Sequence, residues 1–354
     1  MSRCIIKQLV VTHFRNFSFQ EFSFDDNVTW IVGNNGKGKT NTLESIGLLS
    51  TGKSFKSHLL SDCVQTGFDV AHIEANVSVE ADAERIGVSI VSANSELSKR
   101  ASTRFKRNGT NKRRADVTGL LKTIVFRPED LEIVTQGPSY KREYLDMVLI
   151  QVSRSYAHSH KEYEKALKHR NKLILQLREG LVSRNEFTFW DTLLIKHGDV
   201  LTRQRERLIH FINTYVGFPV QGQIQYDHSL MSEERLHQYA VAEVAAGKTL
   251  VGPHRDSLEV CLDVGEGKVL DVGRFGSRGQ QRLAVLWLKI AALQFIEQET
   301  KEIPVLLLDD IFSELDDTNR HLVTALFAGR QVIGTSAESE TNIPDVQQSF
   351  LLRL

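Results

Sequence analysis

One short stretch constrains the fold more than any other part of the chain: positions 31–40 read IVGNNGKGKT. Gly33, Gly38, Lys39 and Thr40 match the pattern G-x-x-x-x-G-K-[ST] of a phosphate-binding loop. Glycines let the backbone of such a loop curl until successive N–H groups point inward and form a nest for an anion. The pattern therefore predicts a strand, a phosphate-binding loop and a helix in that order.

The residues on either side of the loop agree with this prediction. Positions 28–32 form an apolar run that favours a strand, and positions 41–49 suit a helix. The start of that helix would direct the positive end of its dipole toward a bound phosphate. We therefore interpret the stretch as a site for a nucleoside triphosphate rather than a glycine-rich turn that fits the pattern by chance.

The loop residues have distinct expected roles. We expect Lys39 to reach the β- and γ-phosphates and the Thr40 hydroxyl to bind Mg²⁺. The predicted nucleotide-binding residues of the loop are Gly33, Asn34, Asn35, Gly36, Lys37, Gly38, Lys39 and Thr40.

Length and composition narrow the class of protein. The chain has 354 residues and a formal net charge of +0, so any affinity for nucleic acid or membrane must come from local patches. Cys4, Cys63 and Cys261 are far apart and form no zinc pattern, which is typical of a reducing compartment. No stretch approaches the roughly 18 apolar residues of a membrane span, and the N-terminus is too charged for a secretion signal. We expect a cytoplasmic protein that is not embedded in a membrane.

The one pronounced charge cluster lies at positions 99–114, which hold lysines and arginines but no acidic residue. Asn108-Gly109, in its middle, is a strong hairpin signal. We predict a basic β-hairpin that contacts DNA phosphates. The alternative is a solvated edge hairpin whose charges prevent aggregation. The predicted DNA contacts are Arg104, Arg107, Arg113 and Arg114.

Helical periodicity dominates from residue 128 to about residue 236. Two apolar stripes predict an antiparallel helical pair of about 40 Å, at 1.5 Å per residue. The first stripe contains Val152, Tyr156, Tyr163, Leu167, Ile174 and Leu177, and the second contains Trp190, Leu194, His197, Leu201, Leu208 and Ile212. We therefore expect residues 1–127 and 237–354 to form one head, with a helical lobe inserted at 128–236.

Two segments near the C-terminal end carry further signals. Positions 303–308 predict a buried strand that ends in Asp309 and Asp310. An acid at the end of such a strand can hold Mg²⁺ against bound phosphates, and the next acid can orient or deprotonate the attacking water. Ser277 and Gln280 are spaced as a capping box, which predicts the start of a helix that runs to about residue 298.

Four separated stretches together resemble the RecF family, bacterial recombination and repair ATPases of the ABC/SMC-like group. They are GNNGKGKTNTLESI, FRPEDLEIVTQGPSYKREYLD, GPHRDSLEV and FGSRGQQR followed by PVLLLDDIFSELDDTNR. The resemblance covers nearly the whole chain in the order of the family. It implies an α/β fold: an ABC-type P-loop ATPase head with an inserted antiparallel helical lobe.

The resemblance also implies roles for residues. Ser277, Gly279 and Gln280 match the segment that caps the γ-phosphate held by the opposite subunit. Asp316 matches a loop that touches that subunit. The catalytic residues would be Lys39, Asp309 and Asp310, with Asp309 joining Thr40 as a ligand of Mg²⁺.

Proteins of this family are expected to sandwich two ATP molecules in a head-to-head homodimer. The resemblance implies binding to single-stranded, gapped and duplex DNA in the presence of ATP, with release after slow, DNA-stimulated hydrolysis. The implied process is recombinational repair and replication-fork maintenance, including recombinase loading and support of the SOS response. RecR, often with RecO, is the implied partner.

Two departures from the ABC pattern keep alternatives open. Asp310 stands where many ABC enzymes have Glu, and a shorter side chain agrees with slow turnover. Thr335-Ser336 follows the last predicted strand, and no switch histidine is found there. A non-hydrolysing ATP-binding DNA scaffold is one alternative. The other is the energy subunit of an ABC transporter, which usually carries L-S-G-G-Q where this chain has Gly276-Ser277-Arg278-Gly279-Gln280.

Overall fold

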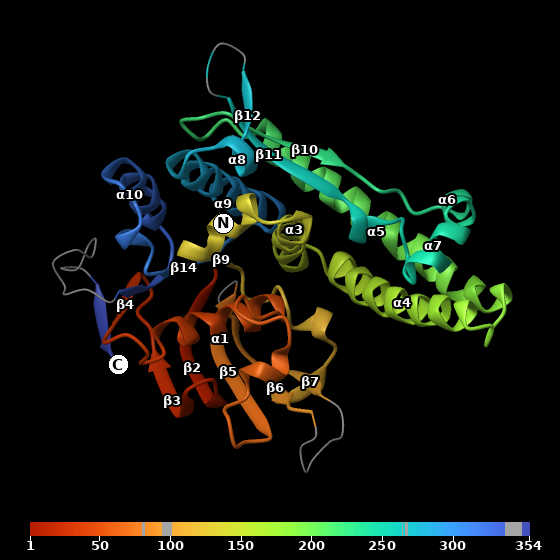
Figure 1. Ribbon diagram of the computed structural model, residues 1–354. Helices are drawn as coiled ribbons and strands as arrows, with labels where there is room; N and C mark the ends of the chain where they lie inside the picture. The colour runs from red at the N-terminus through yellow and green to blue at the C-terminus, as the bar shows by residue number, and fades with distance from the viewer. Residues whose placement is uncertain (80–81, 94–100, 264, 266–267, 337–348) are drawn as a thin grey trace. The chain divides into compact units, whose positions relative to one another are not determined.

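The computed structural model describes residues 1–79, 82–93, 101–263, 265, 268–336 and 349–354 (Figure 1). The chain divides into two compact units. The first unit consists of Met1–Asp130 and Ile296–Leu354, and the second consists of Leu131–Phe295.

An antiparallel sheet of six strands occupies the N-terminal part of the first unit. Its strand order is β3-β2-β5-β6-β7-β8. The strands are β2 Ile5–Phe14, β3 Phe17–Ser23, β5 Val70–Val79, β6 Asp82–Val91, β7 Ser102–Arg107 and β8 Thr110–Lys112. Asn108 and Gly109, between β7 and β8, have φ values of 50° and 77°. A type I′ turn requires positive φ at both central residues. The antiparallel pairing of β7 with β8 across this turn confirms the predicted hairpin.

A parallel sheet of five strands forms the second part of this unit, in the order β16-β4-β15-β14-β9. The strands are β4 Val28–Val32, β9 Thr123–Phe126, β14 Val305–Asp309, β15 Val332–Ser336 and β16 Phe350–Arg353. Every residue of β4 and β14 is buried, as expected for a parallel sheet covered on both faces. The strand predicted at 303–308 begins at Val305, because Glu302–Ile303 forms β13, which pairs with β1 (Ser2–Arg3).

Helix α1 (Lys39–Thr51) packs into the core of the first unit. The core side chains include Ile6, Leu9 and Val11 of β2, Leu43, Ile46 and Leu49 of α1, and Val305 and Leu307 of β14. Gln331, which is 1% exposed, accepts from the Ile6 N–H at 2.8 Å and donates to the Ile6 C=O at 2.8 Å. It thereby ties β2 to the residue that precedes β15.

The second unit contains the successive helices α3 (Pro138–Val152), α4 (Arg154–Arg178) and α5 (Thr188–Thr214). The predicted helical pair is confirmed as α4 and α5, with 25 and 27 residues. Arg170 pairs with Asp191 near one end of the two helices, so they run antiparallel. The first predicted stripe is interrupted, since Val152 ends α3 and Ser153 caps α4 by accepting from the Tyr156 N–H.

A three-stranded antiparallel sheet completes this unit, in the order β10-β11-β12. Its strands are β10 Gly222–Asp227, β11 Ser257–Asp263 and β12 Val269–Asp271. The helices around it are α2 Glu132–Thr135, α6 Glu233–Gln238, α7 Ala240–Ala246, α8 Val272–Phe275 and α9 Arg278–Thr300, which continues into the first unit. Within the described ranges, no helix is long and apolar enough to cross a membrane.

The compact unit that contains the helices extends beyond residue 236, where the sequence analysis ended the lobe. The reason is strand pairing, because β10 lies inside the predicted lobe and pairs with β11. Trp287 of α9 also packs on β10, and a Cβ at Gly222 would lie 2.5 Å from the Trp287 ring. Helical periodicity carries no information about such contacts, so the pattern did not predict them.

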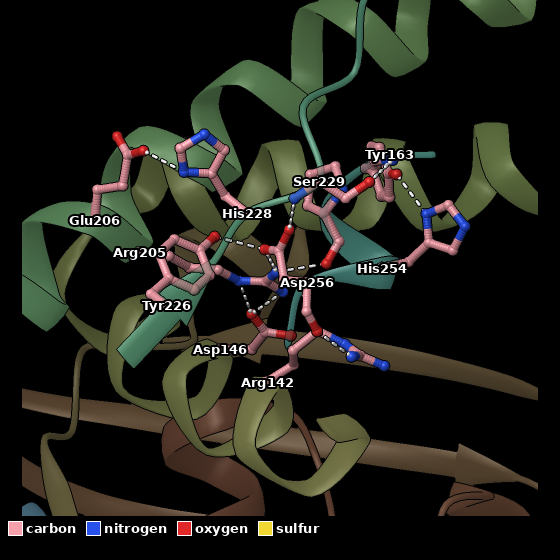
Figure 2. Close-up of polar contacts among 12 residues, drawn as sticks. Arg142, Asp146, Tyr163, Arg205, Glu206, Tyr226, His228, Ser229, His254 and Asp256 are labelled. Carbon is pink, nitrogen blue, oxygen red and sulfur yellow. Dashed lines mark hydrogen bonds and ion pairs between the residues drawn. The ribbon is translucent and has the colours of Figure 1, made fainter. Parts of the chain in front are cut away.

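A buried network of charged side chains connects α5 to α3, and through Asp256 to β10 (Figure 2). Arg205 of α5 is 3% exposed and donates to Asp146 Oδ1 of α3 at 2.8 Å and to Asp256 Oδ2 at 2.8 Å. The Tyr226 hydroxyl of β10 donates to the same Asp256 oxygen at 2.5 Å. The Ser229 N–H donates to Asp256 Oδ1 at 2.8 Å. One guanidinium therefore bridges two buried carboxylates from separate segments.

Candidate nucleotide site and basic hairpin

The predicted phosphate loop connects β4 to α1 in the first unit. Gly36 and Gly38 have φ values of 82° and 103°, which lie in the region that favours glycine. A Cβ at Gly38 would lie 2.4 Å from the Phe17 ring, so a larger residue would also clash. The Asn16 Nδ2 is 3.4 Å from the Gly36 C=O. The turn between β2 and β3 therefore supports the loop from outside.

Lys39 lies at the first position of α1 and is 8% exposed. Its Nζ donates to the Gly33 C=O at 2.6 Å and to the Asn34 C=O at 3.2 Å. The ammonium group is thus held directly over the loop, where it can reach an anion bound by the loop N–H groups.

Thr40 and Asp309 meet at the edge of the parallel sheet. The Thr40 hydroxyl donates to Asp309 Oδ1 at 2.9 Å, and the Thr335 hydroxyl donates to the same oxygen at 2.8 Å. Thr40 follows β4, Asp309 ends β14, and Thr335 belongs to β15, which lies between them. The structure therefore brings the predicted pair Thr40 and Asp309 together, and it adds Thr335, which the sequence analysis had not assigned.

Burial shapes the chemistry of Asp309, which is 4% exposed. Burial raises the pKa of this carboxyl above its ordinary value, while the hydrogen bonds from Thr335 and Thr40 act in the opposite direction. Two hydroxyl donors therefore offset part of the cost of keeping a carboxylate in this place.

Asp310 follows directly and has a left-handed backbone, with φ 48° and ψ 27°. Its N–H donates to the Thr335 hydroxyl oxygen at 3.1 Å, and its C=O accepts from the Ser313 hydroxyl at 2.7 Å. Residues other than glycine adopt this conformation uncommonly, although Asp is among those that tolerate it best. The direction of the second acid is thus set by contacts on both sides of its backbone.

A second polar cluster on α1 had no counterpart in the sequence analysis. Glu44 is fully buried and accepts from Arg15 Nε at 2.9 Å and from the Ser54 hydroxyl. Asn41 donates to Asn16 Oδ1 at 2.8 Å and accepts from Lys56 Nζ at 3.0 Å. These contacts join the loop after α1 to the turn between β2 and β3.

Ser277, Gly279 and Gln280 lie at the start of α9 in the second unit, so the structure does not bring them into one compact unit with the phosphate loop. The predicted capping box is confirmed: Gln280 Oε1 accepts from the Ser277 N–H at 2.8 Å, and Ser277 Oγ accepts from the Gln280 N–H at 3.3 Å. Ser277 and Gly279 are exposed. Asp316 is exposed and caps α10 (Asp317–Thr324) by accepting from the Asn319 N–H at 2.8 Å.

The arginines of the basic hairpin differ in their surroundings. Arg104 and Arg113 are exposed. Arg107 is half-buried and donates through Nε to Glu84 at 3.0 Å. Arg114 is half-buried and donates to the Thr51 C=O at the end of α1 at 2.9 Å. Lys99 and Arg100, which belong to the predicted cluster, lie outside the described residues.

Comparison with known proteins identifies the family to which the chain belongs. A family model described as the RecF/RecN/SMC N terminal domain matches residues 5–342. The DNA replication and repair protein RecF of Lachnoclostridium phytofermentans is 31% identical over 343 residues, covering 94% of this chain and 92% of that protein. The protein of the same description from Oceanobacillus iheyensis is 32% identical over 377 residues, covering 99% and 98%.

A solved structure of the recombination mediator protein RecF-ATP in the RecFOR pathway matches the fold with a TM-score of 0.83. Its sequence is 28% identical, and the match covers 96% of this chain and 93% of that chain. The α/β fold of an ABC/SMC-type P-loop ATPase, predicted from the sequence, is therefore confirmed. The chain belongs to the RecF family of DNA replication and repair proteins.

Proposed function

We propose that this chain binds ATP and Mg²⁺ at the phosphate loop and uses them to control its binding to DNA during recombinational repair. The observation that carries the proposal is the 2.9 Å hydrogen bond between Thr40 and Asp309, beside a loop that holds Lys39 in place. A relative of 28% identity is described as RecF-ATP, which supports ATP as the nucleotide.

The side chains of Thr40 and Asp309 are suitable ligands for Mg²⁺. Among the described residues, no group of three or more His, Cys, Asp or Glu side chains could hold a metal ion by itself. Mg²⁺ does not require such a group, since it is usually bound by one or two protein oxygens together with phosphates and water. The Thr40 hydroxyl and the Asp309 carboxylate are hard oxygen donors of this kind. Bound Mg²⁺ would neutralise charge on the β- and γ-phosphates.

Lys39 would bind the same phosphates as a point charge, with its amine released from the Gly33 and Asn34 carbonyls. Asp310 would orient the attacking water or accept its proton. The short side chain of Asp310 agrees with slow hydrolysis, as expected of a switch. We therefore propose a weak, DNA-stimulated ATPase with Lys39, Asp309 and Asp310 as its catalytic residues.

A second copy of the chain would complete the site. The start of α9 exposes Ser277 and Gly279, and a helix N-terminus with a serine hydroxyl is chemically suited to a phosphate. We propose that Ser277, Gly279 and Gln280 contact the γ-phosphate bound by the opposite subunit. ATP would then hold two copies together, and hydrolysis would separate them.

DNA would bind at the basic hairpin. Arg104 and Arg113 are exposed and can reach DNA phosphates, whereas Arg107 and Arg114 already contact Glu84 and the end of α1. Single-stranded, gapped and duplex DNA remain proposed substrates. RecR and RecO remain proposed partners, because the structural relative is described as part of the RecFOR pathway. A cytoplasmic location remains a prediction.

The test is ATP-dependent dimerisation, measured by sedimentation of the full chain with and without ATP and Mg²⁺. Lys39→Ala should bind ATP at least about tenfold more weakly and remain monomeric, because it loses a charge at the phosphates. Lys7→Ala is the matched control, because Lys7 is an exposed lysine on β2 of the same unit that pairs with Asp26 outside the nucleotide site. Dimerisation of the Lys39 variant at wild-type ATP concentrations would contradict the proposal.

Phosphate release separates a slow ATPase from the non-hydrolysing scaffold. Wild-type protein should release phosphate faster with DNA than without it. Asp310→Asn should still bind ATP and remain dimeric on DNA, because it keeps the phosphate and metal ligands. If the wild type binds ATP and DNA but releases no phosphate under either condition, the scaffold alternative holds.

A further inference from the structure

We propose that Thr335 is a positioning residue of the nucleotide site and sets the direction of both acidic residues at the end of β14. This inference rests on the proposed function, because it names the residue that prepares Asp309 for Mg²⁺ and Asp310 for the attacking water. Thr335 acts through these two acids, so it is a positioning residue rather than a catalytic one.

Strand order places Thr335 between the two halves of the site. β15 pairs in parallel with β14 on one side and with β4 on the other. Thr335 is in register with Asp309 of β14 and with Ile31 of β4, two residues before the phosphate loop begins. A side chain at this position can contact the acidic edge of the sheet directly.

One hydroxyl makes two contacts of opposite direction. Thr335 Oγ1 donates its only hydrogen to Asp309 Oδ1 at 2.8 Å and accepts the Asp310 N–H at 3.1 Å. A hydroxyl has one donor hydrogen and two acceptor lone pairs, so both contacts can form at the same time. Thr335 is 2% exposed, and water therefore does not readily replace it.

The first contact restrains the metal carboxylate. Asp309 Oδ1 also accepts from Thr40, so one hydroxyl from α1 and one from β15 hold the same oxygen. Rotation of the carboxylate would break both hydrogen bonds. Without Thr335, the carboxylate could rotate about the remaining contact with Thr40 and lose its alignment for Mg²⁺.

The second contact restrains the water-activating acid. Asp310 has a left-handed backbone, whose N–H would be left without this partner if the Thr335 hydroxyl were removed. A backbone in a sparsely populated region persists only when its surroundings fix it. The orientation of the Asp310 side chain therefore depends on Thr335, although the two residues are 25 positions apart in sequence.

The chain offers a matched control for a buried threonine in the same sheet. Thr29 of β4 is 0% exposed, and its hydroxyl accepts from the Asp25 N–H at 3.0 Å, away from both acids. Thr29→Val removes a buried hydroxyl of the same kind as Thr335→Val does. Any effect of general sheet destabilisation should therefore occur in both variants.

The experiment compares Thr335→Val, Thr335→Ser and Thr29→Val with the wild type, using full-length protein. ATP binding is measured without Mg²⁺, and ATP binding and phosphate release are then measured across a Mg²⁺ titration. Thr335→Val should keep Mg²⁺-free ATP binding within about threefold and should lower kcat or raise the half-saturating Mg²⁺ concentration by roughly 10–100-fold, the usual cost of losing a partner of a metal ligand. Thr335→Ser, which keeps the hydroxyl, should restore both values to within about threefold. Thr29→Val should match the wild type.

The outcomes separate this inference from the proposed function. If wild-type protein binds no ATP, both are overturned. If it binds ATP and Thr335→Val has the wild-type Mg²⁺ dependence and kcat, the role of Thr335 alone is overturned. The role of Thr335 would also be overturned if Thr335→Val and Thr29→Val changed kcat or the half-saturating Mg²⁺ concentration equally and Thr335→Ser restored neither. Such a result would reflect general damage to the sheet.

Discussion

The Thr40 hydroxyl donates to Asp309 Oδ1 at 2.9 Å, although the two residues are 269 positions apart. The contact arises because β4, β15 and β14 are adjacent parallel strands whose carboxyl ends meet at one edge. The loop that follows β4 carries the proposed phosphate-binding groups, and the end of β14 carries the acids. Folding of the first unit alone therefore brings together Thr40 and Asp309, the two proposed ligands of Mg²⁺.

Asp309→Asn should test the charge at this edge, since it keeps an acceptor for Thr40 but removes the negative charge. We expect phosphate release to fall about 100-fold, while ATP binding without Mg²⁺ changes little. Asp317→Asn provides the control, because Asp317 has a side chain that is 94% exposed on α10 of the same unit. Turnover of the Asp309 variant at the wild-type rate would rule out its role as a metal ligand.

Arg205→Met should destabilise the second unit strongly. The substitution leaves Asp146 and Asp256, which are 5% and 0% exposed, without the guanidinium between them. Loss of one partner from a buried ion pair costs about 3–5 kcal/mol of unfolding free energy, because the other charges stay buried. Urea unfolding of the full chain, followed by circular dichroism, measures the change.

Arg203→Met is the control for this measurement. Arg203 also lies on α5, but it pairs with Asp199 at the surface, where the two side chains are 67% and 57% exposed. Exposed pairs contribute about 0–1 kcal/mol, so the variant should unfold near the wild-type urea concentration. Equal effects of the two substitutions would show that the buried network is not what stabilises the helical pair.

Stability should depend on pH through His254, which contacts the Tyr163 hydroxyl at 2.7 Å and the Thr249 C=O at 3.2 Å. Burial lowers the pKa of His254 from 6.5 to about 4. Between these values the unfolded chain binds a proton that the folded chain does not. The contribution of His254 to the free energy of unfolding is therefore fully present above pH 6.5 and is lost as the pH falls toward 4. The contribution is on the order of 3 kcal/mol.

His254→Gln should therefore flatten the pH dependence of the urea midpoint between pH 6.5 and 5. Gln can keep a donor toward the Thr249 C=O and an acceptor for Tyr163, but it does not titrate. His237→Gln, at an exposed position on α6, should retain the wild-type slope. A wild-type slope in the His254 variant would assign the pH dependence to other groups.

Local patterns predicted the parts of the site that are contiguous in sequence. The loop, its helix and the strand before Asp309 each follow from a few neighbouring residues, and so does the capping box at Ser277. The sequence around Thr335 lacks a switch histidine and carries no other local pattern that indicates a role. The contact of Thr335 with Asp309 depends on strand order, which short-range patterns do not encode.

The same limit explains what was missed in the second unit. The apolar stripe continues from Val152 to Tyr156, so it gave no sign that Ser153 ends one helix and caps the next. Arg205 interrupts a stripe that predicts packing, yet it is buried because Asp146 and Asp256 reach it from other segments. Burial of a charge can be inferred only after its partners are placed.

The salt dependence of DNA binding should distinguish the arginines of the basic hairpin. Removing one side chain that binds a DNA phosphate lowers the slope of log K against log salt by about 0.7–0.9. We expect this decrease for Arg104→Ala on β7 and for Arg113→Ala directly after β8, because both side chains are exposed. Arg107→Ala should keep the wild-type slope, because Arg107 is already paired with Glu84, and it serves as the internal control. Fluorescence anisotropy with gapped DNA between 50 and 200 mM salt, about the range over which such interactions dominate binding, measures the slopes. Identical slopes for all three variants and the wild type would leave the hairpin as a solvated edge, since only side chains that bind DNA phosphates release counterions.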